Sequence, residues 1–155
     1  MIHSLCIITA STSGHTDFVL DEVVRHLRTK CPLLSIKRKR AELATFDDVL
    51  ESDALILGSG TWNTGGVEGQ LNPFMHQFLL EKCKDIKLTG KPIAFVSLGD
   101  DRYYFTTRCT EHFLKFQRMS GATTLVSPLI IVNEPYDQTE KILAWAEKLV
   151  AVVRQ

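Results

Sequence analysis

Short apolar runs alternate along the chain with segments in which apolar residues recur at helical spacing. Five apolar runs predict β-strands, over Leu5–Thr9, Leu33–Ile36, Ala54–Leu57, Ile93–Leu98 and Thr124–Val132, the last interrupted at Ser127-Pro128. Three of these runs are almost continuously apolar. Strands of that composition are typical of sheets that are covered on both faces.

Between the runs, the spacing of apolar residues predicts helices. They are marked by Leu20, Val23, Val24 and Leu27; by Val67, Leu71, Phe74, Met75 and Phe78; by Phe113 and Phe116; and by Ile142, Leu143, Ala146, Leu149 and Val150. The acidic segment Phe46–Ser52 is a candidate for a further short helix, and Asp137 or Gln138 is the candidate start of the last one. Alternating strands and helices imply parallel strands joined by right-handed crossovers. We therefore expect an α/β fold, a three-layer doubly wound five-stranded parallel sheet, in one domain over residues 1–155.

The composition is that of an ordinary globular domain: 45% of the 155 residues are hydrophobic, 23% are charged, and the formal net charge is zero. No apolar run reaches the roughly 20 residues that span a bilayer. The apolar N-terminus has no basic leader and is predicted as a strand, so a signal peptide is not expected. The cysteines are too scattered for a zinc site or a disulfide framework and indicate reduced thiols in a cytoplasmic protein. They are Cys6, Cys31, Cys83 and Cys109.

One segment, Lys37-Arg38-Lys39-Arg40, is strongly basic. Such a run can contact nucleic acid or an acidic partner. No aromatic residue is interleaved with it, and the chain as a whole is neutral. We therefore expect a solvated strand end and no nucleic-acid binding.

In doubly wound sheets, ligands bind beyond the carboxyl ends of the strands. The loop after the first predicted strand is Ser11-Thr12-Ser13-Gly14-His15-Thr16, which leads into a helix whose free amides and dipole favour an anion. Capping that helix needs one hydroxyl residue, whereas residues 9–16 contain five. The loop has neither the lysine of a P-loop nor a GxGxxG pattern. It therefore predicts a site for a phosphate monoester that is held by neutral donors.

The loops after the third and fourth predicted strands carry aromatic residues. The first of them, residues 58–66, contains four glycines and Trp62, and the second, residues 97–105, contains Tyr103. An isolated tryptophan commonly folds over a sheet edge, but two aromatic residues at neighbouring strand ends can cover both faces of a flat ring. Tyr104 and Phe105 are expected to pack at the start of the next helix. The three loops together predict a planar ligand that bears a phosphate.

These three segments together resemble the flavodoxin family. The turn Ser11–Thr16 is similar to the family pattern [ST]-x-[ST]-G-x-T, LILGSGTW contains the glycines and the tryptophan, and SLGDDRYYF matches the GD-x-x-Y spacing. The resemblance covers essentially the whole chain, and the short tail after Gly121 indicates the short-chain form. It implies noncovalently bound FMN and one-electron transfer between redox protein partners, a reductase and an electron acceptor. The expected protein is an electron carrier rather than an enzyme, a cytoplasmic monomer without membrane contacts.

The resemblance also implies the residues of the cofactor site. The phosphate would be bound by the hydroxyls of Ser11, Ser13 and Thr16 and by the amides of Thr12, Gly14 and His15. The isoalloxazine would lie between Trp62 and Tyr103, with the backbone of Thr61, Leu98 and Asp100 at its pyrimidine edge. Asn63, Thr64 and Gly99 complete the expected cofactor site. Asn63 stands where the family frequently has glycine, in a peptide that flips on reduction so that its carbonyl accepts the N5–H of the ring. Because asparagine adopts positive φ less readily than glycine, the flip is expected to stabilise the one-electron-reduced state less than it would with glycine at this position.

Two further features depart from the family. His15 stands where asparagine is common, and a protonated His15 would strengthen phosphate binding at low pH. Flavodoxins are typically strongly acidic, whereas this chain is neutral and has only Glu68 near Trp62. We therefore expect weaker electrostatic steering of redox partners.

Two other functions are compatible with the same fold. An FMN-dependent NAD(P)H:quinone or flavin reductase would need a further substrate site, and the short chain has no obvious segment for it. A flavin-free interaction module would keep the fold without the cofactor. A response-regulator receiver is disfavoured, because no acidic pair follows the first strand and no aspartate ends the third.

Overall fold

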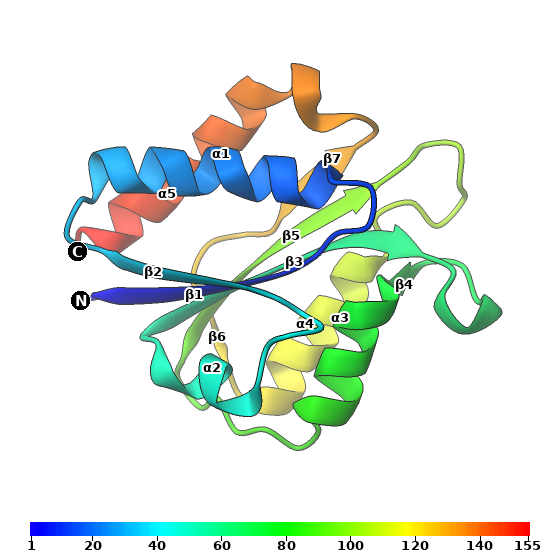
Figure 1. Cartoon of the computed structure of the whole chain (residues 1–155), viewed down its shortest axis with the longest axis horizontal. Helices are drawn as coiled ribbons and strands as arrows, with labels where there is room; N and C mark the ends of the chain where they lie inside the picture. Colours follow the sequence, from blue (N-terminus) through cyan, green and yellow to red (C-terminus); the bar gives the residue numbers. More distant parts are fainter.

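A parallel sheet between two layers of helices forms the body of the protein (Figure 1). The structure is a computed structural model and describes residues 1–155. Its strands are β1 (Ser4–Ala10), β2 (Ser35–Arg40), β3 (Ala54–Trp62), β4 (Gln70–Leu71), β5 (Pro92–Gly99), β6 (Thr123–Thr124) and β7 (Leu129–Val132). Its main helices are α1 (His15–Lys30), α2 (Phe46–Glu51), α3 (Pro73–Gln77), α4 (Cys109–Ser120) and α5 (Thr139–Val153). Short turns η1 (Thr64–Gly66) and η3 (Pro135–Asp137) are 3₁₀ helices, and η2 (Phe78–Lys82) is a π-helix.

The strand order is β2-β1-β3-β5-β6, with β7 also paired to β5. All of these pairs are parallel, so the predicted doubly wound α/β fold with its five-stranded core is confirmed. The fifth strand position is filled by two short pieces, because β6 and β7 pair with the two ends of β5. The break between them contains Ser127-Pro128, as predicted, since proline has no amide hydrogen for a ladder bond.

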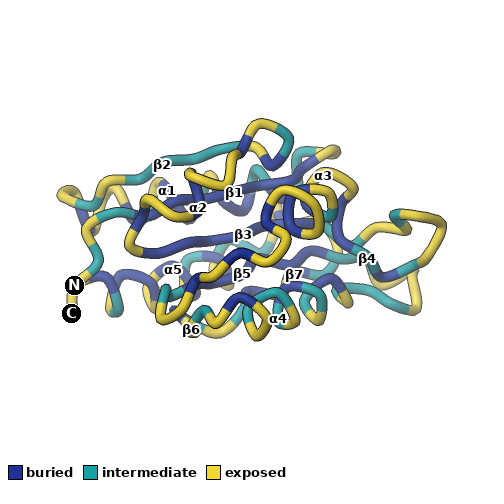
Figure 2. Tube along the Cα trace, turned by 90° about the horizontal axis from the view of Figure 1, so that it is seen from below, coloured by how far each residue is buried: buried dark blue, intermediate teal, exposed yellow.

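Two hydrophobic cores fill the space between the sheet and the helices. Helices α1 and α5 cover one face, and α2, α3 and α4 cover the other (Figure 1). Alternate residues of each central strand enter opposite cores: Ile7 and Ile56 face α1 and α5, whereas Ile8 and Leu57 face the other layer. The central strands are buried along most of their length, and β2 is only partly buried (Figure 2). The lower burial of β2 fits its place at the edge of the sheet, where it pairs only with β1.

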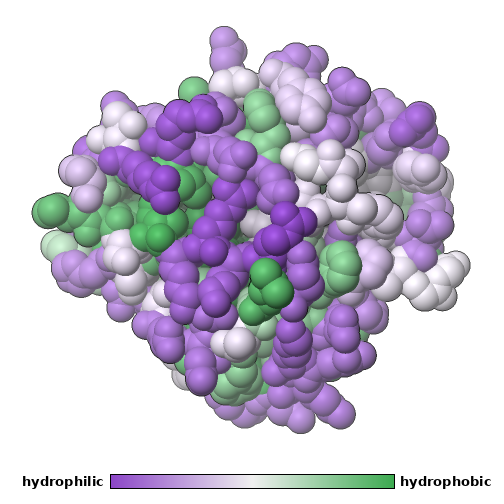
Figure 3. All heavy atoms as spheres, in the orientation of Figure 1, coloured by the Kyte–Doolittle hydropathy of each residue, from purple (hydrophilic) through white to green (hydrophobic).

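The second strand lies further along the chain than predicted. The apolar run proposed for it began at Leu33, but Leu33 is 96% exposed and β2 runs from Ser35 to Arg40. The basic run is therefore the strand itself and not a solvated strand end. An edge strand tolerates charged side chains, and these are paired: Arg38 contacts Asp17 and Asp21 of α1. The face in Figure 3 is mainly hydrophilic, with an apolar area near the two chain termini.

The helix predicted from Val67 is wrong at its start. Val67 lies exposed in a loop, and Leu71 belongs to β4, which pairs antiparallel with the end of β3. Gly66 and Gly69 have φ values of 80° and 84°, which end any helical path through this segment. The helix begins only at Pro73, a residue suited to the first helical position because it needs no amide donor.

Other boundaries differ less. The predicted helix over Phe46–Ser52 is confirmed as α2, and Gln138 occupies the cap position before α5. Tyr104 does not pack at a helix start as expected: it is 88% exposed, and α4 begins later, at Cys109. None of the helices is long and apolar enough to cross a lipid bilayer.

Candidate functional site

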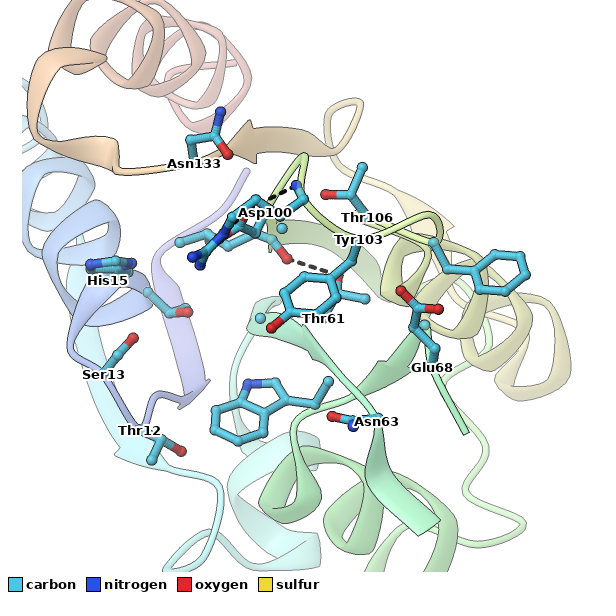
Figure 4. Close-up of a pocket in the computed structure, with 18 of the residues that line it drawn as sticks. Thr12, Ser13, His15, Thr61, Asn63, Glu68, Asp100, Tyr103, Thr106 and Asn133 are labelled. Carbon is cyan, nitrogen blue, oxygen red and sulfur yellow. Dashed lines mark hydrogen bonds and ion pairs between the residues drawn. The ribbon is translucent and has the colours of Figure 1, made fainter. Parts of the chain in front are cut away.

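A cleft of about 870 Å³ opens at the carboxyl ends of β1, β3 and β5. Four loops line it, one after each of these strands and one after β7. Figure 4 shows Thr12, Ser13 and His15 on one side of the cleft and Asn63 and Glu68 on the other. The cleft therefore lies where parallel α/β sheets place their ligands.

The loop after β1 ends at the N-terminus of α1. Gly14 is the cap residue, with φ of 91°, and no side chain caps the helix through a hydrogen bond. The amides of Ser13 and Gly14 donate no hydrogen bond within the protein, and the first amides of a helix have no intrahelical acceptor. The only side chain that accepts from a backbone amide at this end is Ser11, whose Oγ receives a weak bond from the Asp17 amide at 3.4 Å. This turn thus presents unpaired donors and a positive dipole end to the cleft.

Two residues from distant parts of the chain hold this turn from outside. Arg40 at the end of β2 donates from Nη2 to the Ser11 carbonyl at 3.1 Å. Asn72, before α3, donates from Nδ2 to Thr12 Oγ1 at 3.0 Å. The turn itself contains no lysine or arginine, and Arg40 is the only cationic side chain that hydrogen-bonds to it.

Trp62 is the last residue of β3 and is 37% exposed. Its backbone is held by antiparallel pairing with Gln70 of β4. A Cβ atom on Gly60 would lie 3.2 Å from Trp62 Nε1, so the indole lies against this glycine. The neighbouring Thr61 hydroxyl donates to the Leu98 carbonyl at 2.8 Å and ties the end of β3 to β5.

Residues 63–66 form a tight turn beside the tryptophan. Asn63 has φ of −101°, and its carbonyl accepts a hydrogen bond from the Gly66 amide at 3.0 Å. Thr64 turns away from the cleft and donates from Oγ1 to the Leu71 carbonyl at 2.6 Å. Thr64 therefore stabilises the β3–β4 connection instead of lining the cleft.

The loop after β5 brings Tyr103, which is 58% exposed, to the same cleft. It starts at Gly99, where a Cβ atom would lie 2.3 Å from Thr106 Oγ1, so only glycine fits. In the loop, the Arg102 guanidinium binds both carboxylate oxygens of Asp100, and this pairing lowers the pKa of Asp100. The charges of Asp100 and Arg102 therefore cancel within this loop.

The fourth loop was not foreseen as part of the site. Asn133 follows β7 with φ of 68°; its Oδ1 accepts from the Asp101 amide and its Nδ2 donates to the Asp101 carboxylate, both at 3.0 Å. It sits above Asp100 and Thr106 in Figure 4. The signal for it was present in the sequence, because asparagine at the end of a fifth parallel strand obeys the same carboxyl-end rule.

Most residues expected at the site line this one cleft. They are Ser11, Thr12, Ser13, His15, Thr16, Thr61, Trp62, Asn63, Leu98, Gly99, Asp100 and Tyr103. Gly14 and Thr64 do not line it. The lining residues that sequence reasoning did not assign are Ala10, Gly60, Gly66, Glu68, Gly69, Asp101, Arg102, Phe105, Thr106, Asn133 and Glu134.

Comparisons with known proteins agree with the observed fold. The sequence model of the family described as Flavodoxin matches residues 7–145. Flavodoxin 2 of Bacillus cereus is 25% identical with a TM-score of 0.84, over 96% of this chain and 98% of that one. The flavodoxin of Streptococcus pneumoniae TIGR4 is 26% identical with a TM-score of 0.80, over 96% and 98%.

A short-chain flavodoxin associated with a PDU bacterial microcompartment shares the fold at 21% identity and a TM-score of 0.82, over 99% of each chain. Among curated proteins, none matches the sequence. The match over residues 7–145 covers most of the chain, and the structural likeness extends over nearly all of it. The chain belongs to the flavodoxin family.

Proposed function

We propose that the protein binds FMN noncovalently in this cleft and carries single electrons between redox proteins. One observation carries the proposal: a helix N-terminus with unpaired amides and two aromatic side chains from neighbouring strands line the same cleft. The helix end suits a phosphate group, and the aromatic pair suits a flat ring. FMN has both parts.

The turn after β1 is proposed to hold the phosphate. Ser11, Ser13 and Thr16 would donate from their hydroxyls, and the backbone of Thr12, Gly14 and His15 would donate from the amides. Neutral donors that are already fixed in place bind an anion without reorganisation on binding. The absence of an internal acceptor for the Ser13 and Gly14 amides supports this role.

The ring is proposed to lie between Trp62 and Tyr103. Its pyrimidine edge would meet the backbone of Thr61, Leu98 and Asp100, next to Gly99. The 2.8 Å bond from Thr61 to Leu98 fixes these segments relative to each other. In addition, Thr106 Oγ1 is buried, lines the cleft and has no partner in the protein, so it is available to a polar ligand atom.

When bound, FMN supplies the one-electron chemistry, and the protein supplies binding and electrostatics. The half-exposed Trp62 and Tyr103 shield the ring faces from water and leave room for a redox partner at its edge. Around the cleft, Glu68, Asp101 and Glu134 are acidic, and the Asp100–Arg102 pair is neutral. Such a rim attracts a basic partner less than a uniformly acidic one would.

The remaining assignments belong to the same proposal. Residues 1–155 act as a single FMN-binding domain, a monomer that meets a reductase and an electron acceptor in turn. The four cysteines are all buried and free, and burial raises the pKa of Cys6 to about 11 and of Cys83 to about 12. Thiols that stay protonated and unpaired suit the reducing cytoplasm.

The visible absorption spectrum of the purified protein tests the proposal. Flavin bands at a stoichiometry near one FMN per chain, and dithionite reduction in two resolved one-electron steps, are the expected results. A colourless protein that takes up no added FMN would support a flavin-free interaction module instead. Steady oxidation of NADPH or NADH by the flavoprotein alone, with a quinone as acceptor, would identify a reductase and refute the carrier assignment.

A further inference from the structure

Asn72 lies outside the lining of the candidate site but hydrogen-bonds to it. It lies between β4 and α3 and is completely buried, with an exposed fraction of 0%. Its side chain bonds to Thr12 in the turn after β1, 60 positions earlier in the chain, at 3.0 Å. Its own amide donates to Ser59 Oγ of β3 at 3.0 Å.

The orientation of the side-chain amide of Asn72 is fixed by its neighbours. Oδ1 accepts a hydrogen bond from the Phe74 amide at 3.0 Å, and a backbone N–H can only donate. The group that faces Thr12 is therefore Nδ2, which can only donate as well. Thr12 Oγ1 is the acceptor in that bond, so the hydroxyl hydrogen of Thr12 stays free to point into the cleft.

Capping of α3 does not explain this arrangement. The cap uses Oδ1 alone, and serine, threonine or aspartate would serve that position equally well. Only asparagine adds a donor that reaches Thr12. The donor matters because it makes the exposed Thr12 hydroxyl an acceptor on its buried side and leaves it a donor on its cleft side.

Asn72 also connects the turn to the strand that carries Trp62. Ser59, which accepts from the Asn72 amide, donates to the Gly60 carbonyl at 2.8 Å. Ser59 and Asn72 are both completely buried, so water does not compete for these bonds. The turn after β1 and the end of β3 are thus connected through the hydrogen bonds of Asn72 and Ser59.

We propose that Asn72 is a positioning residue for the phosphate: it holds Thr12 so that the hydroxyl of Thr12 donates to the phosphate of the bound ligand. This inference rests on the proposed FMN site and adds a donor, the Thr12 side chain, to the amide expected of that residue. Because the contact concerns the phosphate end only, it affects FMN and not riboflavin, which lacks the phosphate.

The test compares the dissociation constants of FMN and riboflavin, measured by flavin fluorescence quenching on the apoprotein. Asn72→Ser keeps the helix cap but cannot reach Thr12, and Asn72→Asp keeps the shape but loses the donor and adds a negative charge. We expect FMN binding about 5-fold weaker in the serine variant and about 30-fold weaker in the aspartate variant, with riboflavin changed by less than about 2-fold. Val150→Ala, at the far end of α5, is the control for general destabilisation and should leave the ratio of the two constants unchanged.

Thr12→Ala provides the second line of the test, because Thr12 is exposed and the substitution removes the hydroxyl but keeps the backbone amide. It should weaken FMN about 5-fold, and Asn72→Ser should then have almost no further effect in the double variant. Equal losses for FMN and riboflavin, or additive effects of the two substitutions, would overturn the positioning role while leaving FMN binding in place. A wild-type protein that binds neither flavin would overturn the proposed function itself.

Discussion

Asp48→Asn is expected to destabilise the protein by breaking the contact between α2 and the basic edge strand. Asp48 is 4% exposed and lies in the first turn of α2, where it accepts from the Thr45 amide at 2.8 Å. Its carboxylate also pairs with Lys37 and, at 3.7 Å, with Lys39. Asparagine keeps the shape and the capping oxygen but removes the charge.

The magnitude follows from the pKa of Asp48. Burial opposes its ionisation, but hydrogen bonds from Lys37 and Thr45 outweigh burial and lower the pKa from 3.8 to about 2. At about 1.4 kcal/mol per pKa unit, the difference corresponds to about 2.4 kcal/mol of stability at neutral pH. Lys37 and Lys39 are each 39% exposed, so solvent screening reduces the expected loss to about 1–2 kcal/mol.

Urea unfolding between pH 7 and pH 2.5 measures this loss. Because the folded pKa lies below the unfolded one, the stabilisation is present above about pH 4 and is lost as the pH falls towards 2. The stability difference between wild type and Asp48→Asn should therefore shrink over that range. Asp47→Asn is the matched control, since Asp47 lies in the same helical turn but is exposed. A difference that persists undiminished at pH 2.5, or an equal loss in the control, would refute the reasoning.

Three further substitutions test other parts of the structure. Lys91 donates from Nζ to three carbonyls at the end of α2, so Lys91→Met should lower the free energy of unfolding by about 1–2 kcal/mol in urea titrations. Gly99→Ala would place a Cβ atom 2.5 Å from the Thr107 amide and displace the Tyr103 loop, so FMN affinity should fall at least about 10-fold by fluorescence titration. Asn63→Gly should widen the separation between the two one-electron midpoint potentials in a redox titration, because glycine frees the Asn63 carbonyl from its turn at lower cost; an unchanged separation would contradict this.

The sequence by itself determined the features that depend on neighbouring residues. Apolar runs and helical spacing are local patterns, so the parallel strands and the α/β layers could be predicted from them. The turn at Ser11–Thr16 could also be predicted from the sequence, because hydroxyls and a glycine before a helix are a local signal. Two aromatic residues after separate strands could be assigned to one cleft, since the carboxyl ends of parallel strands lie at the same edge of the sheet.

Only the tertiary structure decided which side chains meet across the chain. Ion pairs with α1 and α2 hold the basic run in the sheet edge, and no local pattern marks those partners. Asn133 joins the cleft through Asp101, and Thr64 leaves it for the Leu71 carbonyl. The bond from Asn72 to Thr12 likewise spans 60 positions. Packing brings polar groups from distant parts of the chain together and removes them from water, and a polar group removed from water needs a hydrogen-bond partner. Which groups become partners depends on the fold, because the partners are not neighbours along the chain.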